Sequence, residues 1–268
     1  MNYVISMIPY ANMAPYRSLG CPAGCQWLDC VPRQSSIALR EGITWAAAAP
    51  VGDLPALAGV VDCLGEYGIA AAGPVGSVLL FSDLPFEQLD ASARVRITSQ
   101  SSSSVRLLYL LLHDSAARDR MPAAVAKNAS AEADLLIGDA ALVRARRPGR
   151  RFVFDLAEMW LRRTRLPFVF ARWVIRKDAP PELSASMIEW LDKLREQDAE
   201  LVTKAAPAEA ARLSLSEGEM LAYLRGITRA FGPDELRGQA RFLDELAKLD
   251  PMPFLAPATP QGMHMRRR

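Results

Sequence analysis

Short apolar segments typical of buried strands alternate with helical segments over residues 3–178, and helical spacing continues beyond them. The clearest strand-like segments are residues 3–8, 43–49, 75–82 and 166–175. Alternation of this kind favours helices packed on a largely parallel sheet. In open sheets of this class, ligands bind in the crevice at the carboxyl ends of strands. We therefore expect an α/β fold with its functional site in loops that follow strands.

The length and charge of the chain exclude several functions. It has 268 residues, 50% of them hydrophobic, which suggests one large domain or two small ones. The formal net charge is only +2, without the strongly basic face of a nucleic-acid-binding protein. No apolar run reaches the ~20 residues of a membrane span, and residues 1–6 do not read as a secretory signal. We expect a cytoplasmic protein with no nucleic-acid or membrane partner.

The cysteines raise the question of a metal site. There are four, at Cys21, Cys25, Cys30 and Cys63. A zinc or iron–sulfur site usually has a closer cysteine pair or a histidine nearby, and both histidines, His113 and His264, are distant in sequence. Reduced structural thiols are therefore the favoured interpretation, with a metal site as the alternative. A disulfide framework is not expected in a cytosolic chain of this size.

A serine run precedes a leucine-rich segment, residues 105–112, that we predict to be a buried helix. A helix N-terminus carries free backbone N–H groups and a positive partial charge. Together with the hydroxyls of Ser101, Ser103 and Ser104, it can form an anion site without a cationic side chain. The alternative is a polar linker that only caps the helix. The composition supports these two interpretations about equally.

Three further polar residues lie at ends or bends of predicted strands. Asn12 follows the first strand, Ser77 follows a glycine-rich bend, and Asp139 ends the segment 134–139. Each has a structural alternative: Asn12 can stabilise its own turn, Ser77 can be a tolerated small residue, and Asp139 can cap the next turn. The chain has no Ser-His-Asp pattern, nucleophile elbow, P-loop or zinc-protease motif.

Several motifs occur together in one order along nearly the whole chain. Among them are Ile8-Pro9-Tyr10-Ala11-Asn12, Gly73-Pro74-Val75-Gly76-Ser77 and Leu136-Ile137-Gly138-Asp139. The others fall in residues 31–42, 99–112, 154–173 and 222–243. This ordered set resembles the futalosine-pathway menaquinone biosynthesis proteins, and within them the chorismate dehydratases.

The resemblance implies a two-lobe fold like the type 2 periplasmic binding proteins, with a ligand cleft between the lobes. Residues 1–82 and 171–268 would form lobe one, and residues 83–170 lobe two. It also implies Asp139 and Ser77 as catalytic residues, no metal ion and no organic cofactor. The residues expected to bind the substrate are Asn12, Ser77, Ser101, Ser103 and Ser104.

The implied substrate is chorismate, a small dianion. Dehydration would remove the ring proton beside the ether and the neighbouring hydroxyl, giving aromatic 3-[(1-carboxyvinyl)oxy]benzoate. The site then needs donors where negative charge grows, and Ser103 and Ser104 suit that role. Asp139 is one candidate base, although an anionic ligand would repel its carboxylate unless that group is protonated or screened. The substrate's own enolpyruvyl carboxylate is the other candidate, and we favour it.

The sequence departs from the family at three places, one of which is the N-terminal segment that contains Cys21, Cys25 and Cys30. Val51-Gly52-Asp53 stands where the family usually shows serines, and Ser103 stands where a threonine is common. The alternative functions are a non-catalytic cytosolic protein that binds small anions, or a diverged lyase acting on a related cyclic dicarboxylate. The dihydroxynaphthoate branch fits less well, because neither His113 nor His264 lies in a matching motif. The oligomeric state stays open.

Overall fold

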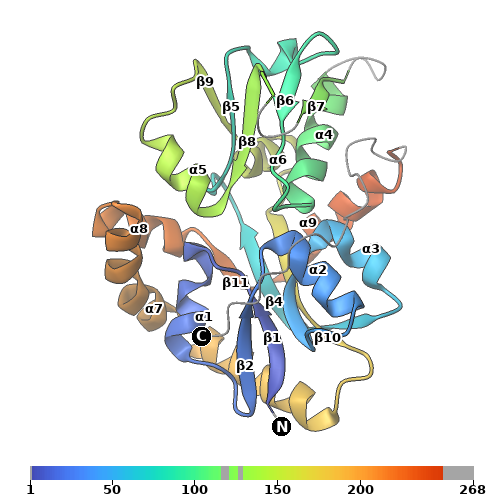
Figure 1. The fold of residues 1–268 in the computed structure, drawn as a ribbon, viewed down its shortest axis with the longest axis vertical. Coiled ribbons are helices and arrows are strands. Elements are labelled where there is room, and N and C mark those ends of the chain that lie inside the picture. The colour runs from blue at the N-terminus through green and yellow to red at the C-terminus, as the bar shows by residue number, and fades with distance from the viewer. Residues whose placement is uncertain (1, 116–120, 126–128, 250–268) are drawn as a thin grey trace.

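The computed structural model describes residues 2–115, 121–125 and 129–249, which form two lobes, each built on its own β-sheet (Figure 1). The lower lobe of Figure 1 contains a sheet with the strand order β11-β4-β10-β3-β1-β2. The strands of this sheet are β1 (Tyr3–Met7), β2 (Cys25–Asp29), β3 (Ala46–Pro50), β4 (Val61–Ala71), β10 (Phe168–Arg176) and β11 (Thr228–Ala230).

The upper lobe contains the second sheet, in the order β7-β6-β8-β5-β9. Its strands are β5 (Val78–Ser82), β6 (Arg94–Arg96), β7 (Ala123–Val125), β8 (Ala133–Ile137) and β9 (Phe152–Asp155). Its helices are α4 (Ser103–Ser115), α5 (Gly138–Ala145), α6 (Leu156–Thr164) and the short 3-10 turn η3 (Phe86–Gln88). The helices of the lower lobe are η1 (Ala11–Met13), α1 (Ala14–Leu19), α2 (Pro32–Arg40), η2 (Val51–Asp53), α3 (Leu54–Leu57), α7 (Pro181–Leu213), α8 (Glu217–Arg225) and α9 (Pro233–Leu246).

The expectation of a largely parallel sheet was wrong for both sheets: β5 runs antiparallel to β8 and β9 in the second sheet, and the first sheet is also mixed. In the first sheet, β1 pairs in parallel with β2 and β3, but β10 runs antiparallel to both β3 and β4. The reason is the path of the chain, which leaves this sheet after β4 and returns through β10. A returning strand inserted between β3 and β4 has to run in the opposite direction. Hydrophobic periodicity carries no information about strand direction, so the sequence could not show this.

The strand pairing also bears on where the chain passes between the lobes. β5, which the predicted boundary after Ser82 assigns to lobe one, pairs with β8 and β9 in the second sheet. The chain therefore changes sheets in the glycine-rich bend before Val78, and it returns between Thr164 and Phe168. We propose lobe boundaries at these two places. The predicted boundaries after Ser82 and Phe170 assign β5 and the start of β10 to the opposite lobes.

A buried aromatic cluster holds the loop after β1 in place. The ring of Tyr16 on α1 lies 5.5 Å from that of Trp173 on β10 and 5.6 Å from that of Trp190 on α7, measured between centroids. The Tyr16 hydroxyl also donates a hydrogen bond to the carbonyl of Gly68 at 3.0 Å. Because α1 directly follows η1, this packing fixes the backbone that carries Asn12.

Helix α4 is buried around most of its circumference, as the leucine-rich sequence predicts. Leu107, Leu108 and Leu112 have no exposed surface. Burial of each such side chain stabilises the fold by roughly 1.5–3 kcal/mol, so the helix is firmly anchored. The N-terminus of α4 is thereby held at a fixed position facing the lower lobe (Figure 1).

Candidate functional site

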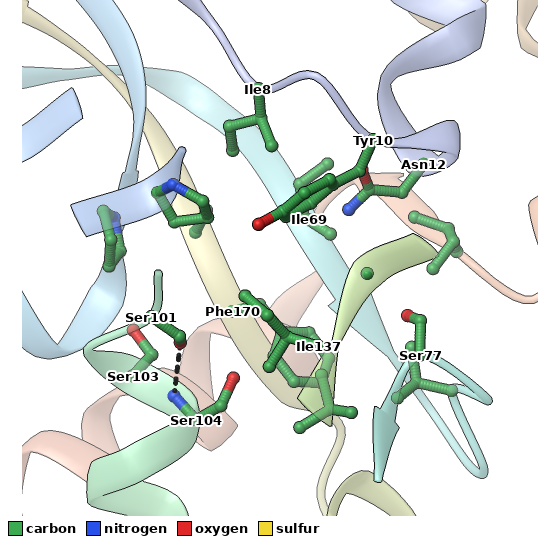
Figure 2. Close-up of a pocket in the computed structure, with 17 residues that line it drawn as sticks. Ile8, Tyr10, Asn12, Ile69, Ser77, Ser101, Ser103, Ser104, Ile137 and Phe170 are labelled. Carbon is green, nitrogen blue, oxygen red and sulfur yellow. Dashed lines mark hydrogen bonds between the residues drawn. The ribbon is translucent and has the colours of Figure 1, made fainter. Parts of the chain in front are cut away.

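A pocket lies between the two lobes, with about 550 Å³ of space between its walls, a volume that includes the part open to solvent. None of the described side chains that line it is charged; the polar ones are Tyr10, Asn12, Ser77, Ser101, Ser103 and Ser104. Its apolar wall includes Ile8, Ile69, Val75, Val78, Ile137, Phe170 and Ile227. In Figure 2 the three serines at the start of α4 face the pocket from one side and Ser77 from the other.

The serines at the start of α4 cap the helix and also line the pocket, while the anion site stays a prediction. Ser101 Oγ accepts a hydrogen bond from the Ser104 N–H at 3.1 Å, which is the capping interaction. Ser103 and Ser104 are only 2% and 3% exposed, and both line the pocket. The buried hydroxyls therefore stand beside the positive end of the helix, an arrangement that attracts an anionic group.

The segment Val51-Gly52-Asp53, where the sequence departs from the family, forms a contact between the lobes. The Gly52 N–H donates to Ser103 Oγ at 3.0 Å. A Cβ on Gly52 would lie only 2.9 Å from Cδ of Arg106 and 3.4 Å from Cα of Ser103. Glycine is therefore what allows η2 to approach α4 so closely. Sequence reasoning did not anticipate this contact, because its partners are far apart in the chain.

Asp53 completes this contact between the lobes. One of its carboxylate oxygens accepts a hydrogen bond from the Arg106 guanidinium at 2.7 Å, and the other accepts from Ser36 Oγ at 2.7 Å. The side chains of Arg106 and Asp53 are 19% and 15% exposed. The Arg106 cation beside the serine run is thus neutralised by Asp53.

Replacing Asp53 with alanine is expected to lower stability by about 2 kcal/mol, because it leaves the mostly buried guanidinium of Arg106 without its carboxylate partner. The measurement is the free energy of unfolding in urea. Glu189→Ala is the matched control, since Glu189 forms an exposed i,i+4 pair with Lys193 and such pairs contribute little. Equal stability of the two variants would contradict the structural role given to Asp53.

On the other side of the pocket, Ser77 and Asn12 have different surroundings. Ser77 is 4% exposed, and its Oγ accepts a hydrogen bond from the Tyr223 hydroxyl at 3.1 Å. Tyr223 lies on α8, and sequence reasoning did not single it out. The buried amide oxygen of Asn12 has no hydrogen-bond partner within the described part of the chain. Since buried polar atoms are nearly always paired, an unpaired one facing a pocket is suited to a ligand.

The structure places Asp139 beside the pocket, and it is not among the lining residues. Its Oδ1 accepts from the Ala11 N–H at 2.8 Å, and its Oδ2 forms an ion pair with Arg212 at 2.8 Å. Both oxygens are therefore engaged by the lower lobe, across from α5, which carries Asp139. Its predicted catalytic role stays a prediction, but these contacts favour a role in joining the lobes.

A second close approach between the lobes involves Gly138 and Tyr10, both of which line the pocket. Gly138 has φ +59°, and a Cβ there would lie 2.7 Å from Cδ2 of the Tyr10 ring. The Tyr10 hydroxyl donates to Gln100 Oε1 at 3.0 Å, and burial raises the pKa of Tyr10 well above its ordinary value. The Tyr10 ring is thus held against the start of α5 in its neutral form.

The described cysteines and acidic residues also bear on whether a metal ion could bind. Within residues 2–115, 121–125 and 129–249, no three His, Cys, Asp or Glu side chains lie close enough to hold a metal ion. Burial raises the pKa of Cys25 to about 11, so this thiol is protonated at neutral pH and poorly reactive. Among the same residues, no helix has the length and apolar character needed to cross a bilayer.

Solved structures show the fold that the sequence resemblance implied. A protein of Archaeoglobus fulgidus superposes with a TM-score of 0.67 at 14% identity, covering 92% of this chain and 96% of that protein. The CA3427 gene product of Candida albicans, described as having the generic periplasmic binding protein fold, gives a TM-score of 0.55 at 10% identity, covering 94% and 92%. The periplasmic aliphatic sulphonate binding protein of Escherichia coli gives 0.55 at 14% identity, covering 91% and 85%.

Sequence comparison gives a more specific relationship. A curated protein of Thermus thermophilus named chorismate dehydratase is 29% identical over 231 residues, which span 80% of this chain and 83% of that protein. The profile of the family described as Menaquinone biosynthesis matches residues 3–248, and this range includes every pocket residue named above. The chain therefore belongs to the menaquinone biosynthesis family.

Proposed function

We propose that this protein is a chorismate dehydratase, which converts chorismate to 3-[(1-carboxyvinyl)oxy]benzoate and water. The observation that carries the proposal is the pocket between the lobes, where uncharged donors at the start of α4 face an apolar wall. Family membership and the Thermus thermophilus relative named chorismate dehydratase support it. As the resemblance implies, we place the reaction in the cytoplasm and in the futalosine route to menaquinone.

The pocket suits a small dianion with a flat carbon ring. One carboxylate would accept hydrogen bonds from Ser103 and Ser104, next to the partial positive charge of the helix end. The ring would lie against Ile137 and Phe170, which form part of the apolar wall. Ser77 and Asn12 would hold the second carboxylate and the hydroxyl from the opposite side.

The reaction is an elimination in which atoms and electrons balance within the substrate. A base takes the proton from the ring carbon that carries the ether, the electron pair forms the new ring double bond, and the neighbouring hydroxyl leaves as water after gaining a proton. In the transition state, negative charge spreads toward the ring carboxylate. Preorganised donors at that carboxylate lower the barrier, because their interaction strengthens as the charge grows.

The substrate's own enolpyruvyl carboxylate is the base that we propose. Asp139 is poorly placed for this step, since its two oxygens are bound by the Ala11 N–H and by Arg212. A carboxylate within the substrate needs only to be folded into reach of the ring proton, which a closed pocket can enforce. Contacts across the lobes, such as the Gly52 to Ser103 hydrogen bond, would help to keep the lobes together around the substrate.

The test is incubation of the purified full-length protein with chorismate, without added cofactor, followed by mass spectrometry of the products. We expect a product lighter than chorismate by one water, formed faster than in a sample without protein. That sample corrects for the spontaneous breakdown of chorismate. Unchanged chorismate in the presence of a folded protein would contradict the proposed reaction.

A non-catalytic small-anion-binding protein is the second candidate function. It is favoured by the fold shared with the Escherichia coli aliphatic sulphonate binding protein and by Gly52 and Asp53 in place of the usual serines. The same incubation separates the two functions. Chorismate that binds tightly but is recovered unchanged would favour the binding protein, whereas conversion would favour the enzyme.

Replacing both Ser103 and Ser104 with alanine is expected to weaken binding of the product 3-[(1-carboxyvinyl)oxy]benzoate by about 30-fold, because two buried donors to a carboxylate are lost. The dissociation constant of this product, which is not turned over, is measured by calorimetry, with a thermal melt to show that the fold is retained. Thr203→Ala, at an exposed position on α7, is the control and should bind normally. Unaltered affinity of the double variant would mean that the anion binds elsewhere.

A further inference from the structure

The hydroxyl of Tyr223 is hydrogen-bonded to Ser77, which lines the pocket. Tyr223 lies on α8, which begins with a capping box formed by Ser216 and Glu219 and buries Met220 and Leu224 completely. These features fix the helix and therefore the position of the tyrosine. Its hydroxyl reaches Ser77 Oγ at 3.1 Å, whereas Tyr223 itself is not among the pocket-lining residues. An effect of the Tyr223 hydroxyl on a ligand is therefore expected to pass through Ser77, the residue to which it is bonded.

The direction of this hydrogen bond follows from the acidity of the two hydroxyls. A phenol is a far stronger acid than an aliphatic alcohol, so the tyrosine is the better donor and the serine the better acceptor. Burial raises the pKa of Tyr223 well above its ordinary value, which keeps the phenol proton in place at neutral pH. Tyr223 is therefore able to act as a permanent donor to Ser77.

A serine hydroxyl that accepts a hydrogen bond from a protein donor can still donate its own hydrogen to a group in the pocket. A serine hydroxyl has one hydrogen and two lone pairs. When Tyr223 donates to one lone pair, the Ser77 hydrogen is left for a group inside the pocket. The same arrangement occurs at the opposite wall, where Ser103 Oγ accepts from the Gly52 N–H at 3.0 Å. Ser77 and Ser103 thus each accept a hydrogen bond from a protein group that is not among the pocket-lining residues.

We propose that Tyr223 is a positioning residue, which orients the Ser77 hydroxyl so that it donates to the negative charge of the bound substrate. This inference rests on the proposed dehydration of chorismate and deepens it. If Ser77 instead donated to Tyr223, only lone pairs would face the pocket, and these would repel an anion. Tyr223 would act by orientation and polarisation.

A double-mutant cycle tests the proposal. The four proteins are the wild type, Tyr223→Phe, Ser77→Ala and the double variant, assayed with chorismate well below their melting temperatures. We expect Tyr223→Phe to lower kcat about fivefold and to change KM less than twofold, because the donor acts mainly on charge that grows in the transition state. In the Ser77→Ala background, the same substitution should have no further effect on kcat.

Tyr3→Phe is the matched control, since the Tyr3 hydroxyl bonds Glu182 away from the pocket, and its kcat should equal that of the wild type. Normal kcat in Tyr223→Phe would overturn the inference. Losses that multiply in the double variant would also overturn it, because Tyr223 would then act independently of Ser77. A wild type that leaves chorismate unchanged would instead contradict the proposed function, and this inference would fail with it.

Discussion

Replacing Ser77 with alanine is expected to lower kcat for chorismate about a hundredfold, the typical effect of removing one preorganised donor from a site where charge develops. Ser77 is buried, lines the pocket and accepts from Tyr223, so its own hydrogen is available to the substrate. Ser77 lies one residue before β5, so the substitution leaves the residues of that strand unchanged. Loss of the hydroxyl should therefore affect turnover much more than folding.

The stability of Ser77→Ala provides a check on this interpretation. The substitution leaves the Tyr223 hydroxyl without its acceptor, at a cost of about 1 kcal/mol and a fall of about 3 °C in the melting temperature. Thr203→Ala, exposed on α7, should lose neither activity nor stability. A Ser77→Ala enzyme with normal kcat would remove Ser77 from the mechanism, whatever its melting temperature.

Replacing Gly138 with alanine is expected to abolish most activity, with kcat/KM falling about a hundredfold or more, because the lobes would no longer close correctly. The added Cβ would lie 2.7 Å from the Tyr10 ring, and contacts this short are not tolerated. Moving the Tyr10 ring aside would also break the hydrogen bond between its hydroxyl and Gln100. The start of α5 and the loop carrying Tyr10 and Asn12 would therefore be pushed apart.

Gly138→Ala would be unfavourable for two reasons, the positive φ of the backbone and the contact with Tyr10. A control variant separates these two causes. With φ +59°, alanine there would cost about 1–2 kcal/mol of stability without any clash. Gly24 has φ +72°, and a Cβ added there would meet no atom within 4 Å, so Gly24→Ala carries the backbone cost alone. We expect both variants to lose stability and only Gly138→Ala to lose activity. Full activity of Gly138→Ala would show that the Tyr10 contact is dispensable.

Much of the fold follows from local sequence patterns. The alternation of apolar segments predicts β1, β5 and β10, and the leucine-rich segment predicts α4. Asp155 caps α6 by accepting from the N–H groups of Ala157 and Glu158 at 3.0 and 3.2 Å, an interaction between residues that are close in the sequence. These features succeed because period, burial and capping are properties of neighbouring residues.

Some of the short or partly exposed strands were not predicted, among them β2 and β11. β2 lies at the edge of its sheet and has only one buried residue, Leu28, so its apolar pattern is weak. β11 has three residues and interrupts a stretch that was expected to be helical. Such strands form because a neighbouring strand offers them hydrogen bonds, and this information lies elsewhere in the chain.

In the candidate site too, the sequence pointed to residues that line the pocket but not to their distant hydrogen-bond partners. The predicted binding residues Asn12, Ser77, Ser101, Ser103 and Ser104 all line one pocket, while their roles stay predictions. The groups that donate hydrogen bonds to Ser77 and Ser103 could not be found from the sequence. Tyr223 is 146 residues from Ser77, and Gly52 is 51 residues from Ser103. Only the folded chain brings these partners together.

The central claim is that uncharged donors at the start of α4 hold a carboxylate of a dianionic ligand. A crystal structure of the protein with 3-[(1-carboxyvinyl)oxy]benzoate bound tests it most directly. We expect one carboxylate within hydrogen-bond distance of the Ser103 and Ser104 hydroxyls and the ring against Phe170. A ligand bound outside this pocket, or one whose carboxylates pair with arginine or lysine side chains, would contradict the claim.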